Sequence, residues 1–352
     1  MGSVILALKR EADITTRVLA TAQHRHMLDQ VLKSFGIVPD IDLDIMSPNQ
    51  ELAALTARLL LSLDDVLLAE KPDLVLAQGD TTTVMTVSLA CFYHHIPFGH
   101  VEAGLRTWDM QNPFPEEANR VIAGRLARWH FAPTESARRN LLREGVNDGR
   151  IFVTGNTVID ALLMTASKEI ELGIPLDAAK RLILVTSHRR ENFGQPFLNI
   201  CRALKTLAER NPAIQILYPV HPNPHVKDVA QALLSNCGNI ILCEPLDYAP
   251  FVAAMKCAYL IISDSGGVQE EGPALGKPVL VLREETERPE AVEMGVVQLV
   301  GSNHACIVEA VQLLLDDSEA YKKMARGASP YGDGKASERI VSVIRNSFTK
   351  CS

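Results

Sequence analysis

Short apolar runs alternate with longer amphipathic segments along this chain, and this alternation limits the possible folds more than any other feature. Runs such as Leu182–Thr186 and Tyr259–Ser263 are rich in Leu, Ile and Val and fit buried strands. Pro196–Glu209 has the apolar spacing of a helix. Strands that alternate with helical crossovers form parallel sheets. The sequence therefore predicts an α/β fold.

The expected strands form two series, separated by the polar and weakly patterned segment Ser167–Lys180. At 352 residues the chain is long enough for two domains, each with its own core. We expect two doubly wound domains, with Ser167–Lys180 as the linker. The expected strands are Thr16–Thr21, Leu74–Gln78, Phe98–Val101, His130–Ala132, Ile151–Thr154, Leu182–Thr186, Ile214–Tyr218, Ile240–Cys243, Tyr259–Ser263, Val279–Leu282 and Val297–Val300, and the expected helices include Met27–Phe35, Pro115–Leu126, Pro196–Glu209 and Ile307–Asp316.

Composition and charge limit which binding partners and which cellular compartment we expect. A net charge of -7 argues against nucleic acid or an anionic membrane as the main partner. No apolar run reaches the roughly 18 residues of a membrane span, and the N-terminus lacks the basic region of a secretory signal. The seven cysteines form no CxxC pair, which favours free thiols in a reducing cytoplasm.

Polar residues follow the carboxyl ends of many predicted strands, among them Asp80, Glu102, His188, His221 and Asp264–Gly266. In open α/β sheets this edge is where ligands bind. If the two sheets face each other, these groups converge on one cleft between the domains. The pattern therefore predicts a ligand site there.

The stretch Asp264–Glu271 predicts nucleotide binding. It joins a buried strand to a helix through Gly266 and Gly267, which leave backbone N–H groups open to an anion. A carboxylate of Glu270 or Glu271 can accept hydrogen bonds from a ribose diol. Phosphate and ribose together indicate a nucleotide.

Several acids precede or open predicted helices. Asp80 alone fits a helix cap, and one of Glu116 and Glu117 fits an acid favoured by the helix dipole. Glu102, directly after an apolar strand, is harder to explain structurally. Arg120 lies four residues after Glu116, the spacing of an ion pair. Three acids near one cleft suit general acid–base chemistry, because crowded carboxylates push their pKa values apart.

The spacing of the histidines and glycines argues against a metal site and against nicotinamide or flavin binding. The basic loop at His188 fits either a solvated turn or the neutralisation of a diphosphate. Pro222 and Pro224 prevent the regular helix that His221 and His225 would need to share a metal ion. The sequence has no GxGxxG motif, so we expect neither a metal nor a nicotinamide or flavin cofactor.

The chain resembles the non-hydrolysing UDP-N-acetylglucosamine 2-epimerases. The resemblance runs from Thr21–Arg25 to Pro330–Gly334, and its motifs are long and specific. They are Gly79–Thr83, His100–Thr107, Pro115–Arg120, Thr154–Thr157, His188–Glu191, Asp264–Glu271 and Thr286–Glu290.

The resemblance implies two Rossmann-like domains in the glycosyltransferase-B arrangement, with residues 1–166 plus 331–352 in the N-terminal domain and residues 167–330 in the UDP-binding domain. It implies reversible inversion at C2 of UDP-GlcNAc to UDP-ManNAc without a cofactor, through elimination of UDP and a bound 2-acetamidoglucal. A cytoplasmic homodimer serving bacterial surface polysaccharide biosynthesis is expected, with no nucleic acid or membrane partner.

The resemblance also assigns roles to individual residues. Asp80, Glu102 and Glu116 are acid–base candidates, and Arg120 and His188 position groups or stabilise charge. Ser265, Gly266, Gly267 and Arg288 hold phosphate, Glu271 the ribose, and Phe251 with the backbone near Leu246 the uracil. Gln23, Glu191 and His221 fit a second, allosteric UDP-GlcNAc site, although His26 and Asn49 depart from the pattern of members that have one.

The start of the sequence departs from the family. Members begin with a strand that runs into Gly-Thr-Arg-Pro-Glu, a segment this sequence does not contain, and Met1–Lys9 resembles the helix that follows it. We therefore expect a missing central strand and weak or absent activity. The alternatives are a hydrolysing epimerase that releases ManNAc and UDP, a glycosyltransferase of similar architecture, and an inactive nucleotide-sugar-binding protein.

Overall fold

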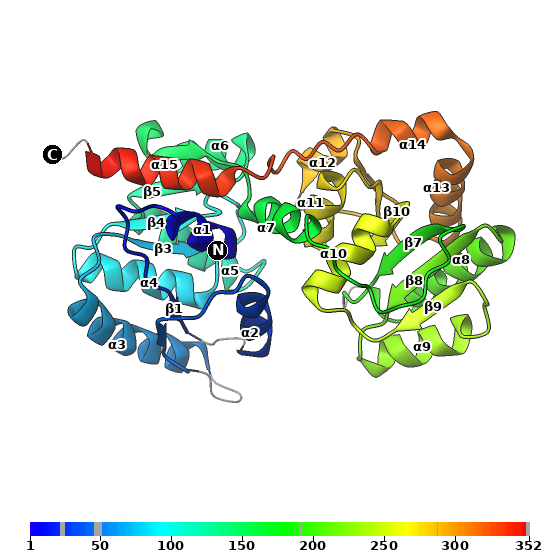
Figure 1. Ribbon diagram of the computed structural model, residues 1–352, viewed down its shortest axis with the longest axis horizontal. Coiled ribbons are helices and arrows are strands. Elements are labelled where there is room, and N and C mark those ends of the chain that lie inside the picture. Colours follow the sequence, from blue (N-terminus) through cyan, green and yellow to red (C-terminus); the bar gives the residue numbers. More distant parts are fainter. Residues whose placement is uncertain (22–24, 46–50, 190–191, 287, 350–352) are drawn as a thin grey trace. The chain divides into compact units, whose positions relative to one another are not determined.

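The structure is a computed structural model that describes residues 1–21, 25–45, 51–189, 192–286 and 288–349. The chain divides into two compact units, Met1–Ala161 with Tyr331–Ser352 and Leu162–Pro330. Both units are built of helices around parallel strands (Figure 1). The predicted α/β class is therefore confirmed. Among the described residues, no helix has both the length and the apolar character needed to cross a membrane.

The first unit contains a four-stranded parallel sheet in the order β3-β4-β5-β6. A separate two-stranded parallel sheet pairs β1 with β2. The strands are β1 (Leu19–Ala20), β2 (Ile41–Asp42), β3 (Val75–Gln78), β4 (Phe98–Val101), β5 (Trp129–Ala132) and β6 (Ile151–Val153). The helices are α1 (Gly2–Leu8), α2 (Arg25–Ser34), α3 (Leu52–Glu70), α4 (Thr82–Tyr93), α5 (Glu116–Leu126), α6 (Glu135–Arg143), the 3-10 turn η1 (Asp148–Arg150), α7 (Thr157–Ala166), which runs into the second unit, and α15 (Ala336–Thr349).

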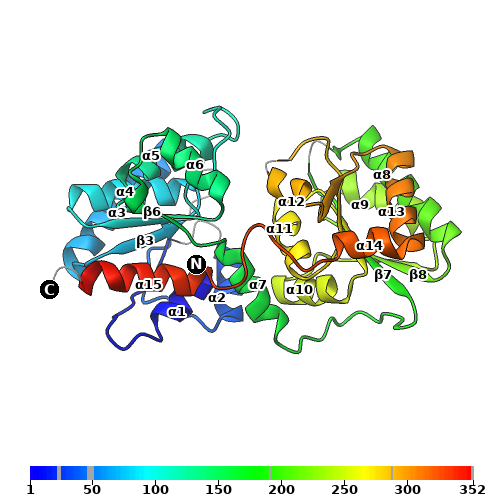
Figure 2. The ribbon, with the colours of Figure 1, turned by 90° about the horizontal axis from the view of Figure 1, so that it is seen from above.

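The two ends of the chain meet on this unit, where α1 and α15 lie side by side (Figures 1 and 2). Val4 of α1 packs with Ile340 and Ile344 of α15 against Val101 and Phe131 of the sheet. All five side chains are buried, and apolar burial of this kind drives folding. The core of the first unit is thus closed by segments from opposite ends of the sequence.

The second unit contains a six-stranded parallel sheet in the order β12-β11-β10-β7-β8-β9. The chain order of these strands reverses between β7 and β10, which defines the switch point of a doubly wound sheet. The strands are β7 (Arg181–Thr186), β8 (Ile214–Pro219), β9 (Ile240–Cys243), β10 (Leu260–Ser263), β11 (Val279–Val281) and β12 (Val297–Leu299). The helices are α8 (Gln195–Arg210), α9 (Pro224–Leu234), α10 (Tyr248–Cys257), α11 (Gly266–Ala274), α12 (Pro289–Glu293), α13 (His304–Asp316) and α14 (Ser318–Met324).

Helices cover both faces of this sheet (Figure 2), with α8, α9 and α13 on one side and α10, α11 and α12 on the other. A sheet covered on both faces buries consecutive residues of its strands. Leu182–Val185 of β7 and Leu260–Ser263 of β10 are accordingly buried throughout. This burial explains why the apolar runs of the second half predicted their strands well.

One predicted strand of the first unit was wrong in extent, and one strand was missed. The strand expected over Thr16–Thr21 is reduced to Leu19–Ala20, and its partner Ile41–Asp42 was not predicted. Both strands have two residues, too few for an apolar pattern to identify them. The expected linker Ser167–Lys180 contains no helix or strand. The glycosyltransferase-B arrangement of the units and the missing first strand stay predictions.

Candidate functional site

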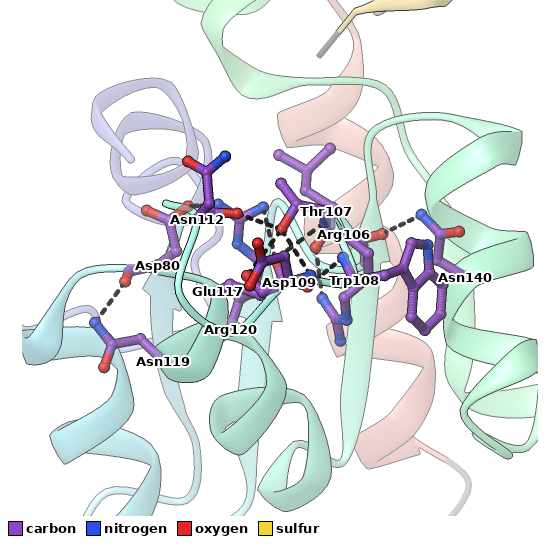
Figure 3. A network of polar contacts seen from close by, with 12 residues as sticks. Asp80, Arg106, Thr107, Trp108, Asp109, Asn112, Glu117, Asn119, Arg120 and Asn140 are labelled. Carbon is purple, nitrogen blue, oxygen red and sulfur yellow. Dashed lines mark hydrogen bonds and ion pairs between the residues drawn. The ribbon is translucent and has the colours of Figure 1, made fainter. Parts of the chain in front are cut away.

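Asp80 lies in the turn after β3, and its carboxylate does not cap the helix that follows. Thr81 caps α4 instead, accepting a hydrogen bond from the backbone N–H of Val84. The Asp80 carboxylate accepts a hydrogen bond from Arg120 Nη2 at 2.8 Å, and its backbone carbonyl accepts one from Asn119 Nδ2 at 2.9 Å. The turn after β3 is therefore fixed to α5 (Figure 3).

The pKa of Asp80 is raised above the usual value of 3.8, chiefly because burial disfavours the charged form. The positive charge of Arg120 opposes this rise, and the negative charge of Glu116 adds to it. An acid with such neighbours can exchange a proton more readily near neutral pH than an exposed aspartate.

Glu117, the neighbour of Glu116 in the first turn of α5, is buried with 1% of its surface exposed. Its carboxylate accepts hydrogen bonds from the backbone N–H groups of Thr107 and Trp108, and its Oε2 lies 3.3 Å from Arg120 Nη1 (Figure 3). A buried charge is tolerated only when it is paired and hydrogen-bonded in this way. Of the two adjacent acids, Glu117 is thus the one with a clear structural role.

Glu102 follows β4 with a left-handed backbone, φ 63°. Its side chain is half-buried, and its Oε2 accepts a hydrogen bond from Gln78 Nε2 at 3.0 Å. Non-glycine residues adopt this conformation rarely, and they do so most often at functional sites and tight turns. Gln78 ends β3, so Glu102 and Asp80 both lie at the carboxyl edge of the same sheet.

Two buried histidines lie on neighbouring strands of this sheet, His100 on β4 and His130 on β5. His100 Nε2 lies 2.7 Å from the carbonyl oxygen of Gly79, the residue before Asp80. Burial lowers the pKa of His100 to about 4, and that of His130 likewise to about 4. Both rings are therefore neutral at physiological pH, and His100 must donate its Nε2 proton to the carbonyl. The contact ties β4 to the turn that carries Asp80.

In the second unit, Asp264 organises the loop that follows β7. This carboxylate is completely buried, and its Oδ2 accepts hydrogen bonds from Ser187 Oγ, from the backbone N–H groups of His188 and Arg189, and from Asn192 Nδ2, all within 3.0 Å. Asp264 follows β10, so the contacts join the two loops at the switch point. Ligands of doubly wound sheets bind at this point.

The amino end of α11 carries the predicted phosphate residues Ser265, Gly266 and Gly267. Ser265 takes the N-cap position, but its side chain makes no capping hydrogen bond. A Cβ atom on Gly266 would lie 2.8 Å from Arg288 Nη1, and Arg288 Nε donates to Glu270 Oε1 at 2.6 Å. The absence of a side chain at residue 266 therefore lets the guanidinium approach the helix end, where an anion is favoured.

Glu271, the predicted ribose ligand, is buried and accepts a hydrogen bond from the hydroxyl of Tyr248 at 3.1 Å. Burial raises the pKa of Glu271 to about 7, and the negative charge of Glu270 adds to the rise, while the Tyr248 hydrogen bond opposes it. Tyr248 opens α10, which also carries Phe251, and Leu246 lies just before that helix. The predicted ribose and uracil residues thus belong to neighbouring elements of one unit.

The predicted allosteric residues are only partly described. Gln23 and Glu191 lie outside the described residues. His221 follows β8, and its ring stacks on that of His188 with centroids 6.0 Å apart and an interplanar angle of 16°. In the described part of the chain, no group of three or more His, Cys, Asp or Glu side chains could hold a metal ion.

Comparison with known proteins identifies the family. A family model described as UDP-N-acetylglucosamine 2-epimerase matches residues 6–345. The chain belongs to the UDP-N-acetylglucosamine 2-epimerase family. The enzyme of that name from Yersinia pestis is 53% identical over 356 residues, which cover 98% of this chain and 95% of the relative.

Solved structures of this epimerase family agree with the fold. The Neisseria meningitidis UDP-GlcNAc 2-epimerase bound to UDP-GlcNAc is 48% identical, with a TM-score of 0.87 over 98% of this chain and 96% of the other. The Methanocaldococcus jannaschii enzyme in complex with UDP-GlcNAc and UDP is 35% identical, with a TM-score of 0.79 over 98% of this chain and 95% of the other. Membership of the UDP-N-acetylglucosamine 2-epimerase family is therefore confirmed.

The sequence did not reveal the roles of several residues that hold the site residues or their loops in place by hydrogen bonds. The sequence explains Glu117 only through the helix dipole, and it places Asp264 at the predicted ligand edge of this epimerase-family chain without giving it a role of its own. For Asp264 a signal existed, because an acid directly after a fully apolar strand must be buried and therefore needs several donors. Tyr248 contacts Glu271 and Gln78 contacts Glu102, in each case more than 20 residues away. No local sequence pattern predicts such contacts.

Proposed function

We propose that this chain interconverts UDP-GlcNAc and UDP-ManNAc without net hydrolysis. The observation that carries the proposal is the relationship to UDP-GlcNAc 2-epimerases over nearly the whole chain, together with acids grouped at one sheet edge and an open helix end in the other unit. The two units have different proposed roles. Acids of the first unit act on the sugar, and the second unit binds the UDP moiety.

In the first unit, one carboxylate among Asp80, Glu102 and Glu116 removes the C2 proton of the sugar. The C1–O bond then breaks, UDP leaves with the bonding electron pair, and 2-acetamidoglucal forms. A second acid protonates C2 from the opposite face, and a phosphate oxygen of UDP attacks C1 again. Proton transfer on two faces requires at least two acids. Arg120 supports this step by holding the Asp80 carboxylate in place.

In the second unit, the UDP moiety binds through backbone and side-chain donors. Ser265, Gly266 and Gly267 hold the diphosphate at the amino end of α11, and Arg288 and His188 neutralise its charge. Glu271 accepts hydrogen bonds from the ribose diol, and Phe251 with the backbone near Leu246 contacts the uracil. The same donors stabilise the charge that UDP gains as the C1–O bond breaks.

Phosphorus NMR of a reaction with UDP-GlcNAc separates the proposal from the hydrolysing alternative. We expect the two diphosphate signals of UDP-GlcNAc to be joined by a second pair from UDP-ManNAc until a constant ratio is reached, with no steady growth of free UDP. Accumulation of UDP together with free ManNAc would instead establish a hydrolysing epimerase.

A further inference from the structure

The two oxygens of the Asp264 carboxylate have different surroundings. Ser187, His188, Arg189 and Asn192 place four donors on Oδ2. Among the described residues Oδ1 has no hydrogen-bond partner, and it lies 3.4 Å from Nδ1 of His188. Both oxygens are inaccessible to solvent, since Asp264 is completely buried. An ionised oxygen in such a place is stabilised by a nearby N–H group. The Nδ1 atom of His188 faces this oxygen at ion-pair distance, without the geometry of a hydrogen bond.

The ring of His188 is held from a second direction. It stacks on the ring of His221, whose Nδ1 accepts a hydrogen bond from the backbone N–H of Asn223 at 3.2 Å. A ring nitrogen that accepts a hydrogen bond carries no proton, so neutral His221 must carry its proton on Nε2. The two stacked rings therefore have neighbours that favour opposite tautomers.

We propose that Asp264 is a positioning residue that keeps a proton on Nδ1 of His188 and orients the ring so that its charged form donates Nε2–H to the diphosphate. This inference rests on the proposed function, in which His188 contacts the diphosphate. The side chain of His188 is 45% exposed, so a part of the ring remains accessible to a ligand. The buried carboxylate also stabilises the ring when it is positively charged, which favours the departure of an anionic UDP. Asp264 itself touches neither sugar nor phosphate.

The tautomers can be measured in the unaltered protein without any turnover. Long-range ¹H–¹⁵N NMR spectra of the histidine rings distinguish Nδ1–H from Nε2–H, and His188→Gln and His221→Gln identify the two signals. In the neutral rings we expect Nδ1–H for His188 and Nε2–H for His221. A His188 ring protonated on Nε2 alone would overturn the proposal, whether or not the protein turns over UDP-GlcNAc.

The substitution Asp264→Asn should change the His188 tautomer in a known direction. Four donors converge at Oδ2, so the amide oxygen must take that place and the NH₂ group must replace Oδ1 beside His188. An N–H donor next to Nδ1 favours the unprotonated state of that nitrogen, so the His188 proton should move to Nε2. We expect kcat to fall about a hundredfold, the low end of the loss when one donor to a developing charge is removed, with KM changed much less.

Asn192→Ala is the matched control, because it removes one donor to Oδ2 of the same carboxylate and leaves Oδ1 beside His188. It should leave the His188 tautomer unchanged. An unchanged tautomer in Asp264→Asn, or the same tautomer change in both variants, would show that Asp264 only stabilises the loop. If Asp264→Asn does not fold, the His188 tautomer measured in the unaltered protein tests the proposal. An unaltered protein that shows the expected tautomers but no epimerisation would contradict the proposed function and leave the Asp264 contact established.

Discussion

Arg120 Nη2 donates a hydrogen bond of 2.8 Å to Asp80 Oδ2, and this contact joins the first turns of α5 to the turn after β3. The other arm of the guanidinium faces the buried carboxylate of Glu117 at 3.3 Å. Arg120 therefore lies between an acid that holds the 107–108 loop and an acid proposed to carry protons. Mutations on either side of Arg120 should have different consequences.

Glu117→Ala should cost about 3–5 kcal/mol of the free energy of unfolding, the range seen when one partner of a buried ion pair is removed. The substitution leaves the N–H groups of Thr107 and Trp108 without their acceptor and Arg120 without one partner. Urea denaturation measures the change. Glu135→Ala, which removes an exposed partner of Arg138, is the control and should cost no more than about 1 kcal/mol. Equal losses in the two variants would contradict the structural role of Glu117.

Asp80→Asn should abolish turnover and stabilise the fold at neutral pH. Because the folded-state pKa of Asp80 is raised, folding favours its protonated form, and this contribution is lost as the pH rises through the raised pKa. Above that pKa the unaltered protein carries the cost of a buried charge, which the variant lacks. The difference in thermal midpoint should grow as the pH rises through the raised pKa and should shrink towards the usual aspartate value of 3.8. A difference that grows at acid pH would contradict this assignment.

Binding of UDP-GlcNAc should depend on the ionisation of Glu271. If only the carboxylate accepts the ribose hydroxyls, a pKa of about 7 makes the affinity rise by about tenfold between pH 6 and pH 8. Calorimetry in the Asp80→Asn background would measure binding without turnover, and Glu271→Gln should remove the pH dependence. The same pKa predicts that Glu271 lowers the stability of the ligand-free protein as the pH rises from about 4.5 to above 7.

Tyr248→Phe should shift the binding transition to higher pH. The Tyr248 hydroxyl donates to Glu271 Oε1 and lowers the pKa of that carboxyl, so its removal should raise the pKa above 7. Affinity at pH 7 should then fall, while affinity at pH 9 should recover. Tyr321→Phe removes a tyrosine hydroxyl that donates to the carbonyl of Tyr259 in the same unit, and it should leave the transition in place.

Gly266→Ala should weaken UDP binding by about tenfold, equivalent to about 1.4 kcal/mol. The new methyl group would lie 2.8 Å from Arg288 Nη1 and would displace the guanidinium from the end of α11. A crystal structure of the variant should show Arg288 moved. Gly238→Ala is the control, because a Cβ atom there meets nothing within 4 Å, and its affinity for UDP should equal that of the unaltered protein.

The sequence predicted the second unit more accurately than the first. Strands such as Leu260–Ser263 lie in a sheet covered on both faces, so their burial is visible as continuous apolar runs. Leu19–Ala20 and Ile41–Asp42 pair over two residues only, and tertiary contacts rather than local pattern define them. The same limit applies to the candidate site. Asp80, Glu102, Glu271 and Arg120 could be named from motifs. The contacts that fix the three acids, from Arg120, Gln78 and Tyr248, span 23 to 40 residues of sequence, so no local pattern indicates them.

Incubation with UDP-GlcNAc in deuterated water tests the central claim most directly. Proton removal from C2 followed by return from the solvent-exchanged acid should place deuterium at C2 of UDP-ManNAc as it forms, and later at C2 of the remaining UDP-GlcNAc. Tight binding of UDP-GlcNAc with no deuterium at C2 of either sugar would contradict the proposed epimerisation.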